Sequence, residues 1–266
     1  MNQTAEVALP QKAILGEGAI WCHKRKRLIW VDILSQNVNI YDPRTSDNQV
    51  FHIGQDVGTV VPRESGGFLL AVRDGFASFD PDIENLEIVT LQKKEGIRFN
   101  DGKCDPAGRF WAGTMADDAQ EGAAALYCLE RDLSVSIKIP KVTISNGLVW
   151  SLDKKSFYYI DTPTRQIVSY DYDNASGHIE NCQVAIKIDN QLGKPDGMTI
   201  DEKGILYVAM WEGGKVVRIN PITGVLLDSI EVPGANLVTS CTFGGVNLDE
   251  LYITTARLGL SDSDLK

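Results

Sequence analysis

Phe157-Tyr158-Tyr159-Ile160-Asp161 is a short run of aromatic and β-branched residues in the middle of the chain. Such a run is typical of a β-strand, because these side chains pack well on a pleated sheet. Five similar runs are closed by turn-forming residues at other points of the sequence: Leu28-Ile29-Trp30-Val31-Asp32, Gly67-Phe68-Leu69-Leu70-Ala71, Arg109-Phe110-Trp111-Ala112-Gly113, Ile205-Leu206-Tyr207-Val208-Ala209 and Glu250-Leu251-Tyr252-Ile253-Thr254. The sequence therefore predicts six strands of one type.

The predicted strands belong to a longer repeat. A second strand follows each run after a turn, and several second strands end alike, as in Ile40-Tyr41-Asp42-Pro43 and Arg218-Ile219-Asn220-Pro221. In the segments before the six runs, 46 residues separate Asn100 from Asn146 and 50 separate Asn146 from Asp196. This spacing is typical of four-stranded propeller blades. We predict an all-β fold in which residues 1–266 form one six-bladed β-propeller domain.

The last repeat looks incomplete at the C-terminus. After Tyr252-Ile253-Thr254 the chain has room only for Ala256 to Leu260 and an acidic, serine-containing tail that ends at Lys266. Sheet edges need protection. We therefore expect either that a segment near Ala5 to Pro10 adds a strand that closes the ring, or that the last blade is truncated.

The composition favours a folded protein that does not bind nucleic acid. Hydrophobic residues make up 43% of the chain and charged residues 23%, and the formal net charge is −10. A negative surface repels phosphate backbones and anionic lipids. The five cysteines are scattered, and no apolar run is long enough to cross a bilayer. We expect a cytoplasmic monomer or weak dimer with reduced thiols and no membrane partner.

Polar residues recur where an apolar residue is expected. The first strand of each propeller blade starts near the central axis, so residues at the same position of the repeat converge. Four repeats carry oxygen ligands there: Glu17, Asn100 with Asp101, Asn146, and Asp196. Buried carboxylates are costly unless they are paired or bound to a metal, and a hard divalent cation prefers carboxylate and amide oxygens. This pattern predicts a divalent metal on the axis. Each polar residue or pair is also followed by Gly, and Asn-Gly and Asp-Gly are common in ordinary turns.

At these residues the chain resembles the gluconolactonase, regucalcin (senescence marker protein) and luciferin-regenerating enzyme family. The resemblance extends from about Ala13 to Leu258 and is carried by motifs in the family's order: Gly16-Glu17-Gly18-Ala19-Ile20-Trp21, Arg98-Phe99-Asn100-Asp101-Gly102-Lys103, Ser145-Asn146-Gly147-Leu148, Pro195-Asp196-Gly197-Met198 and Cys241-Thr242-Phe243-Gly244-Gly245.

The resemblance implies a role for six residues. Glu17, Asn146 and Asp196 would be the protein ligands of one divalent cation, which in this family is calcium, zinc, manganese or magnesium. Arg98 and Asn100 would hold the substrate. A further position that contacts substrate is usually Glu in the family and falls here on Asp118, which is one methylene shorter.

The predicted activity is hydrolysis of small sugar lactones, such as gluconolactone, to the hydroxy acid. A metal can polarise the ester carbonyl and activate water, so no nucleophilic side chain is needed. Asp196 is the candidate general base, since it would touch both cation and water. The alternatives are a non-catalytic calcium-binding regulator of the regucalcin type, a protein-interaction propeller, and another metal-dependent esterase on the same fold.

Overall fold

A computed structural model describes residues 3–261 as a ring of twisted antiparallel sheets. The first two sheets contain β2 (Gly16–Cys22), β3 (Arg27–Asp32), β4 (Asn37–Asp42) and β5 (Asp47–His52), then β6 (Val57–Pro62), β7 (Phe68–Val72), β8 (Gly75–Asp80) and β9 (Asn85–Leu91). The next two contain β10 (Ile97–Cys104), β11 (Phe110–Ala116), β12 (Ala124–Leu129) and β13 (Val135–Val142), then β14 (Ser145–Trp150), β15 (Ser156–Asp161), β16 (Gln166–Asp173) and β17 (His178–Lys187).

The remaining strands form one seven-stranded sheet within the part of the chain that the structure describes. It contains β1 (Gln3–Thr4), β18 (Lys194–Ile200), β19 (Leu206–Trp211), β20 (Lys215–Ile219), β21 (Leu226–Glu231), β22 (Leu237–Gly244) and β23 (Glu250–Ala256). The strands β19 and β22 are joined at a single residue pair, Trp211 with Leu237. Two short 3₁₀ helices, η1 (Thr162–Thr164) and η2 (Asn190–Leu192), lie between strands.

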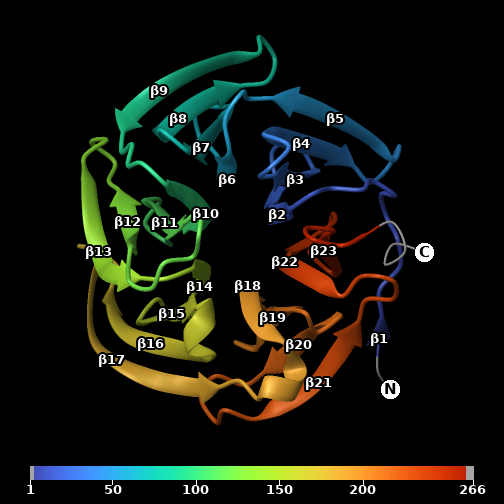
Figure 1. Ribbon diagram of the computed structural model, residues 1–266, viewed down its shortest axis with the longest axis vertical. Coiled ribbons are helices and arrows are strands. Elements are labelled where there is room, and N and C mark those ends of the chain that lie inside the picture. The colour runs from blue at the N-terminus through green and yellow to red at the C-terminus, as the bar shows by residue number, and fades with distance from the viewer. Residues whose placement is uncertain (1–2, 262–266) are drawn as a thin grey trace.

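The sheets surround a common centre (Figure 1). The strands β2, β6, β10, β14, β18 and β22 lie nearest the centre, and β5, β9, β13, β17 and β21 lie on the perimeter. The apolar core lies between neighbouring sheets. For example, the Trp111 ring of β11 packs against Phe157 of β15 at 5.2 Å between centroids. The arrangement is an all-β, propeller-like ring, and all six strands predicted from the aromatic and β-branched runs are present.

Every central strand carries an irregularity at the same place. In β2, β6, β10, β14, β18 and β22 the pairing register with the next strand shifts within the first three residues. A β-bulge of this kind bends a strand and changes the direction of a side chain. The shifts fall at or beside Glu17, Asn100, Asn146 and Asp196. The repeat in the sequence therefore corresponds to a β-bulge near the start of each central strand.

The glycines after the polar residues lie inside strands rather than in the turns that Asn-Gly and Asp-Gly dipeptides favour, and of the four only Gly18 has a positive φ. Asn146-Gly147 and Asp196-Gly197 lie inside strands β14 and β18, and neither glycine has a positive φ. A Cβ on Gly147 would lie 2.6 Å from the carbonyl oxygen of Asp196, and one on Gly197 would lie 2.8 Å from that of Thr239. Glycine is required here because neighbouring central strands approach so closely, a long-range constraint that a dipeptide cannot reveal.

Of our two expectations for the last repeat, the added strand near Ala5 to Pro10 is wrong, and the truncated last blade stays a prediction. The N-terminal strand is β1, Gln3–Thr4, which pairs in parallel with β21. Residues 5–10 contain no strand. Instead Leu9 packs against the aromatic cluster that includes Tyr41, and the Tyr41 hydroxyl donates to the carbonyl oxygen of Ala8. Apart from the Ala5 amide, which donates to the carbonyl oxygen of Glu231 at 2.8 Å, side-chain packing replaces sheet pairing in this segment. The serine-containing tail, residues 262–266, lies outside the described residues.

Candidate metal and substrate site

Glu17, Asn146 and Asp196 come from three different sheets and are all buried at the bulges of β2, β14 and β18. The Asn146 amide is held on both sides. Its Nδ2 donates to the Thr162 hydroxyl at 2.8 Å, and its Oδ1 accepts from Asn100 Nδ2 at 3.2 Å. The Thr162 hydroxyl in turn donates to the carbonyl oxygen of Pro195 at 2.8 Å. This chain of bonds ties Asn146 to the residue that precedes Asp196.

Within residues 3–261, one oxygen of the Asp196 carboxylate lacks a partner that would stabilise its negative charge. Its Oδ1 is buried and has no hydrogen-bond partner among the described residues. Burial raises the pKa of Asp196, and the charges of Glu17 and Asp101 raise it further. A buried carboxylate oxygen without a donor is costly. A cation bound to this oxygen would offset that cost.

The ionised form of Glu17 is disfavoured for the same reason. Burial raises its pKa to about 8, and the charge of Asp101 adds to the effect. The amide of Gly18 donates to Glu17 Oε2 at 3.2 Å, and the charge of Arg98 also favours the ionised form. The Gly18 hydrogen bond and the Arg98 charge lower the pKa of Glu17 by less than burial and Asp101 raise it. The two carboxylates and the amide oxygen of Asn146 are the donor types that a hard divalent cation prefers.

No group of three or more His, Cys, Asp or Glu side chains within residues 3–261 is arranged to hold a metal ion. The predicted ligand set contains only two residues of these types, since its third member is the Asn146 amide. The donor chemistry of the set and the unpartnered Asp196 oxygen fit a cation.

Arg98 and Asn100 lie beside this group. Arg98 Nη1 donates to Asn100 Oδ1 at 2.7 Å and to the carbonyl oxygen of Phe99 at 3.0 Å. Asn100 Nδ2 donates to the carbonyl oxygen of Ser145 at 2.8 Å as well as to Asn146. The structure therefore brings Arg98, Asn100 and Asn146 into one hydrogen-bonded chain, and burial lowers the pKa of Arg98.

Asp118 lies apart from the other five predicted residues. It is exposed in the loop between β11 and β12, and its Oδ1 accepts from the amide of Gln120 at 3.1 Å. It lines a pocket of about 380 Å³ together with Ile97, the residue before Arg98. The structure thus places Asp118 at an adjoining pocket, without a hydrogen bond to the buried residues.

Two further polar residues of β10 accompany the site. Asp101 is buried, its Oδ1 accepts from the Gly102 amide at 2.7 Å, and burial raises its pKa. The partly buried Lys103 reaches β18, where its Nζ donates to the carbonyl oxygen of Met198 at 2.8 Å. The sequence signal was the polar run Asn100-Asp101-Gly102-Lys103. The repeat pattern placed Asp101 with Asn100 among the oxygen ligands, the family resemblance assigned a role only to Asn100, and Lys103 was missed.

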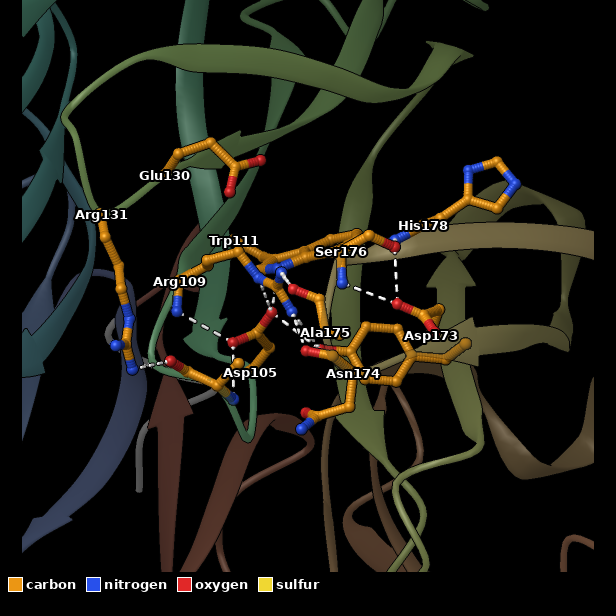
Figure 2. Close-up of polar contacts among 12 residues, drawn as sticks. Asp105, Arg109, Trp111, Glu130, Arg131, Asp173, Asn174, Ala175, Ser176 and His178 are labelled. Carbon is orange, nitrogen blue, oxygen red and sulfur yellow. Dashed lines mark hydrogen bonds and ion pairs between the residues drawn. The ribbon is translucent and has the colours of Figure 1, made fainter.

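A second polar network lies in the turns at the other end of β10 (Figure 2). Asp105 accepts from Arg109 Nε at 2.5 Å, from Trp111 Nε1 at 3.1 Å and from the Tyr172 hydroxyl at 2.8 Å. Arg109 also donates to the carbonyl oxygens of Asn174 and Ala175. These groups satisfy one another and join the sheet of β10–β13 to that of β14–β17. The network is structural, and our sequence analysis gave it no role.

No helix among residues 3–261 is both long enough and apolar enough to span a membrane.

Comparison with known proteins is consistent with these features. Residues 15–257 match the family model described as the SMP-30/Gluconolactonase/LRE-like region. The chain is 40% identical to the "Putative sugar lactone lactonase YvrE" of Bacillus subtilis (strain 168), over 95% of this chain and 87% of that protein. It is 41% identical to regucalcin of Danio rerio, over 96% of this chain and 87% of that protein.

Among solved structures, a luciferin-regenerating enzyme superposes with a TM-score of 0.92 at 34% identity, over 97% of this chain and 89% of that chain. The predicted resemblance is therefore confirmed. The chain belongs to the SMP-30/gluconolactonase/LRE-like family.

Proposed function

We propose that this protein is a metal-dependent hydrolase of small sugar lactones, such as gluconolactone. Membership of a family that includes gluconolactonases supports lactone hydrolysis at the level of the family. We also propose that residues 1–266 form one domain of six blades, in which β22 and β23 belong to a blade of their own. The equivalent bulges in six central strands support this count within the described chain.

The observation that carries the proposal is the buried Asp196 Oδ1 without a donor, beside a buried Glu17 whose pKa is raised. We assign Glu17, Asn146 and Asp196 as ligands of one divalent cation. A cation bound there would polarise the lactone carbonyl and lower the pKa of a water molecule. Oxygen ligands of this kind suit calcium, magnesium or manganese and also permit zinc.

The chain's own residues would carry the remaining chemistry. Asp196 takes the proton from water as the water oxygen attacks the carbonyl carbon. It then gives this proton to the alkoxide that leaves when the ring C–O bond breaks. Arg98 donates hydrogen bonds to the substrate, and Asn100 fixes the Arg98 guanidinium through the 2.7 Å bond to Nη1.

A calcium-binding protein without lactonase activity is the second candidate function. It is favoured by the similarity to regucalcin of Danio rerio and to a solved Agrobacterium tumefaciens regucalcin that is described as calcium-binding. That structure superposes with a TM-score of 0.91 at 25% identity, over 95% of this chain and 86% of that chain.

A screen of aldonolactones with a pH indicator separates the two functions. The purified protein, supplied with calcium, zinc, manganese or magnesium, is expected to release acid from at least one lactone. Binding of a divalent cation with no hydrolysis of any lactone would instead favour the calcium-binding function. Hydrolysis of aryl esters but not of lactones would favour another esterase.

Asp118→Glu is expected to change the ranking of lactones by about tenfold in kcat/KM, since one methylene in a pocket is worth about that much. Metal affinity should stay the same, because Asp118 lies outside the buried group. Steady-state kinetics on a lactone panel and calorimetric metal titration measure the two effects. A large loss of metal affinity with an unchanged ranking would instead place Asp118 among the metal ligands.

A further inference from the structure

Arg73 joins two acidic residues from neighbouring sheets. It lies in the turn between β7 and β8, and its Nη2 contacts Asp56 Oδ2 at 2.5 Å. The same guanidinium binds both oxygens of Asp117, from Nη1 at 3.0 Å and from Nη2 at 2.9 Å. Asp56 precedes β6 and Asp117 follows β11, so one side chain connects the sheet of β6–β9 to the sheet of β10–β13.

Asp117 begins the loop that carries Asp118. The amide of Asp117 donates to the carbonyl oxygen of Gly96 at 2.8 Å, just before β10. At the other end of the loop, Lys94 Nζ donates to the carbonyl oxygen of Ala123 at 3.1 Å. Residues 94–96 and 117–123 are thus bonded to each other at both ends of the loop, and Arg73 fixes the end nearer to Asp118.

These two segments enclose the pocket of about 380 Å³. Its polar lining comes from Lys94, Glu95, Asp117, Asp118 and Gln120. Carboxylate and amide oxygens accept hydrogen bonds from hydroxyl groups. The lining therefore suits a neutral, hydroxylated ligand.

The pocket is electrostatically linked to Arg98. The charges of Asp56 and Asp117 act to raise the pKa of Arg98, and the charge of Arg73 acts to lower it. Arg73 therefore opposes the negative potential that Asp56 and Asp117 produce at Arg98, the residue that we assign to substrate binding.

We propose that Arg73 is a positioning residue that fixes the acidic wall of this pocket, where the family resemblance already places a substrate contact at Asp118. The inference rests on the proposed function. About a third of the Arg73 side chain is exposed, at 32%, and Asp117 is exposed to 47%. The pair with Asp117 therefore contributes little to stability. Asp56 is only 11% exposed, so removal of Arg73 also leaves a buried carboxylate without its partner, and the stability of Arg73→Met is measured beside its KM.

Arg73→Met tests the proposal, and Arg25→Met is its matched control. Arg25 also binds both oxygens of an aspartate, Asp82, and its side chain is 33% exposed. It lies in the turn after β2, at the opposite end of that strand from Glu17. The control thus removes an ion pair like that of Arg73 with Asp117, but it leaves no buried carboxylate like Asp56 behind, so the unfolding free energies of both variants are compared as well.

In Arg73→Met, the KM for a neutral aldonolactone is expected to rise by roughly two- to fivefold, the factor that corresponds to one exposed ion pair. Both kcat and metal affinity should stay unchanged. The amide hydrogen of Asp117 should exchange faster, as followed by hydrogen exchange. Adding Asp117→Asn to Arg73→Met should raise KM little further, because the two residues act through one contact. Arg25→Met should show none of these changes.

The outcomes keep the two proposals apart. If the wild type hydrolyses lactones while Arg73→Met retains wild-type KM and exchange, the positioning role is overturned and the proposed function stands. If the wild type hydrolyses no lactone, the proposed function fails together with the ligand assigned to the pocket. Faster Asp117 exchange in Arg73→Met would still support the positioning of the loop, and unchanged exchange would overturn it.

Discussion

Asp196→Asn is expected to lower kcat for lactone hydrolysis by about 10² to 10⁴ at saturating metal, the usual contribution of a positioned proton acceptor. Asparagine keeps the shape and one carbonyl oxygen of the side chain but cannot take up a proton at neutral pH. Metal affinity should fall only in part. Initial rates measured across a metal titration separate the two effects.

Glu17→Gln is the control for Asp196→Asn. It removes one unit of charge from the same proposed ligand set, and Glu17 is as buried as Asp196, since each is 4% exposed. It leaves the proposed base in place. Its kcat at saturating metal should therefore stay much closer to that of the wild type. Equal losses in both variants would mean that Asp196 acts only as a ligand and that another group carries the proton.

Asp105→Asn is expected to destabilise the protein by about 3 to 5 kcal/mol, as is typical when one partner of a buried ion pair is removed. The Asp105 side chain is 0% exposed, and its partner Arg109 is 6% exposed. The substitution leaves the Arg109 charge buried without a counter-charge (Figure 2). It also weakens the junction with Tyr172 of the neighbouring sheet. Urea unfolding followed by tryptophan fluorescence measures the change.

Asp82→Asn is the matched control for the stability experiment. It also breaks an Arg–Asp pair, in which Arg25 binds both oxygens of Asp82, but Asp82 is 70% exposed. Its cost should stay below about 1 kcal/mol. Metal affinity should be unchanged in both variants, because the Asp105 network lies at the other end of β10 from Asn100. A loss of stability in Asp105→Asn no larger than in Asp82→Asn would contradict the structural role of the network.

Local sequence pattern was enough to predict the strands and the phase of the repeat. Aromatic and β-branched runs such as Phe157-Tyr158-Tyr159-Ile160 mark strands because the signal is contained in neighbouring residues. Polar residues at equivalent repeat positions singled out Glu17, Asn100, Asn146 and Asp196, whereas Arg98 and Asp118 came from the family resemblance alone. Glu17, Asn146 and Asp196 are buried in three different sheets, although their roles as ligands stay a prediction.

Features that depend on distant contacts escaped prediction. Gly147 is needed because β18 lies against it, whereas the dipeptide Asn146-Gly147 by itself indicates a turn. The acceptor role of Asp105 depends on Tyr172, which is 67 residues away. The N-terminal strand was misplaced because its partner β21 lies far along the chain, so nothing in the neighbouring residues marks which of them pair. None of these contacts has a local sequence signal.

The central claim is that a divalent cation on Glu17, Asn146 and Asp196 is required for lactone hydrolysis. It is tested most directly by measuring lactone turnover after exhaustive chelation and again after a divalent ion is restored. We predict that turnover disappears on chelation and returns with the ion, because no other source of carbonyl polarisation is evident. Full turnover by protein in which elemental analysis finds no metal would contradict the account.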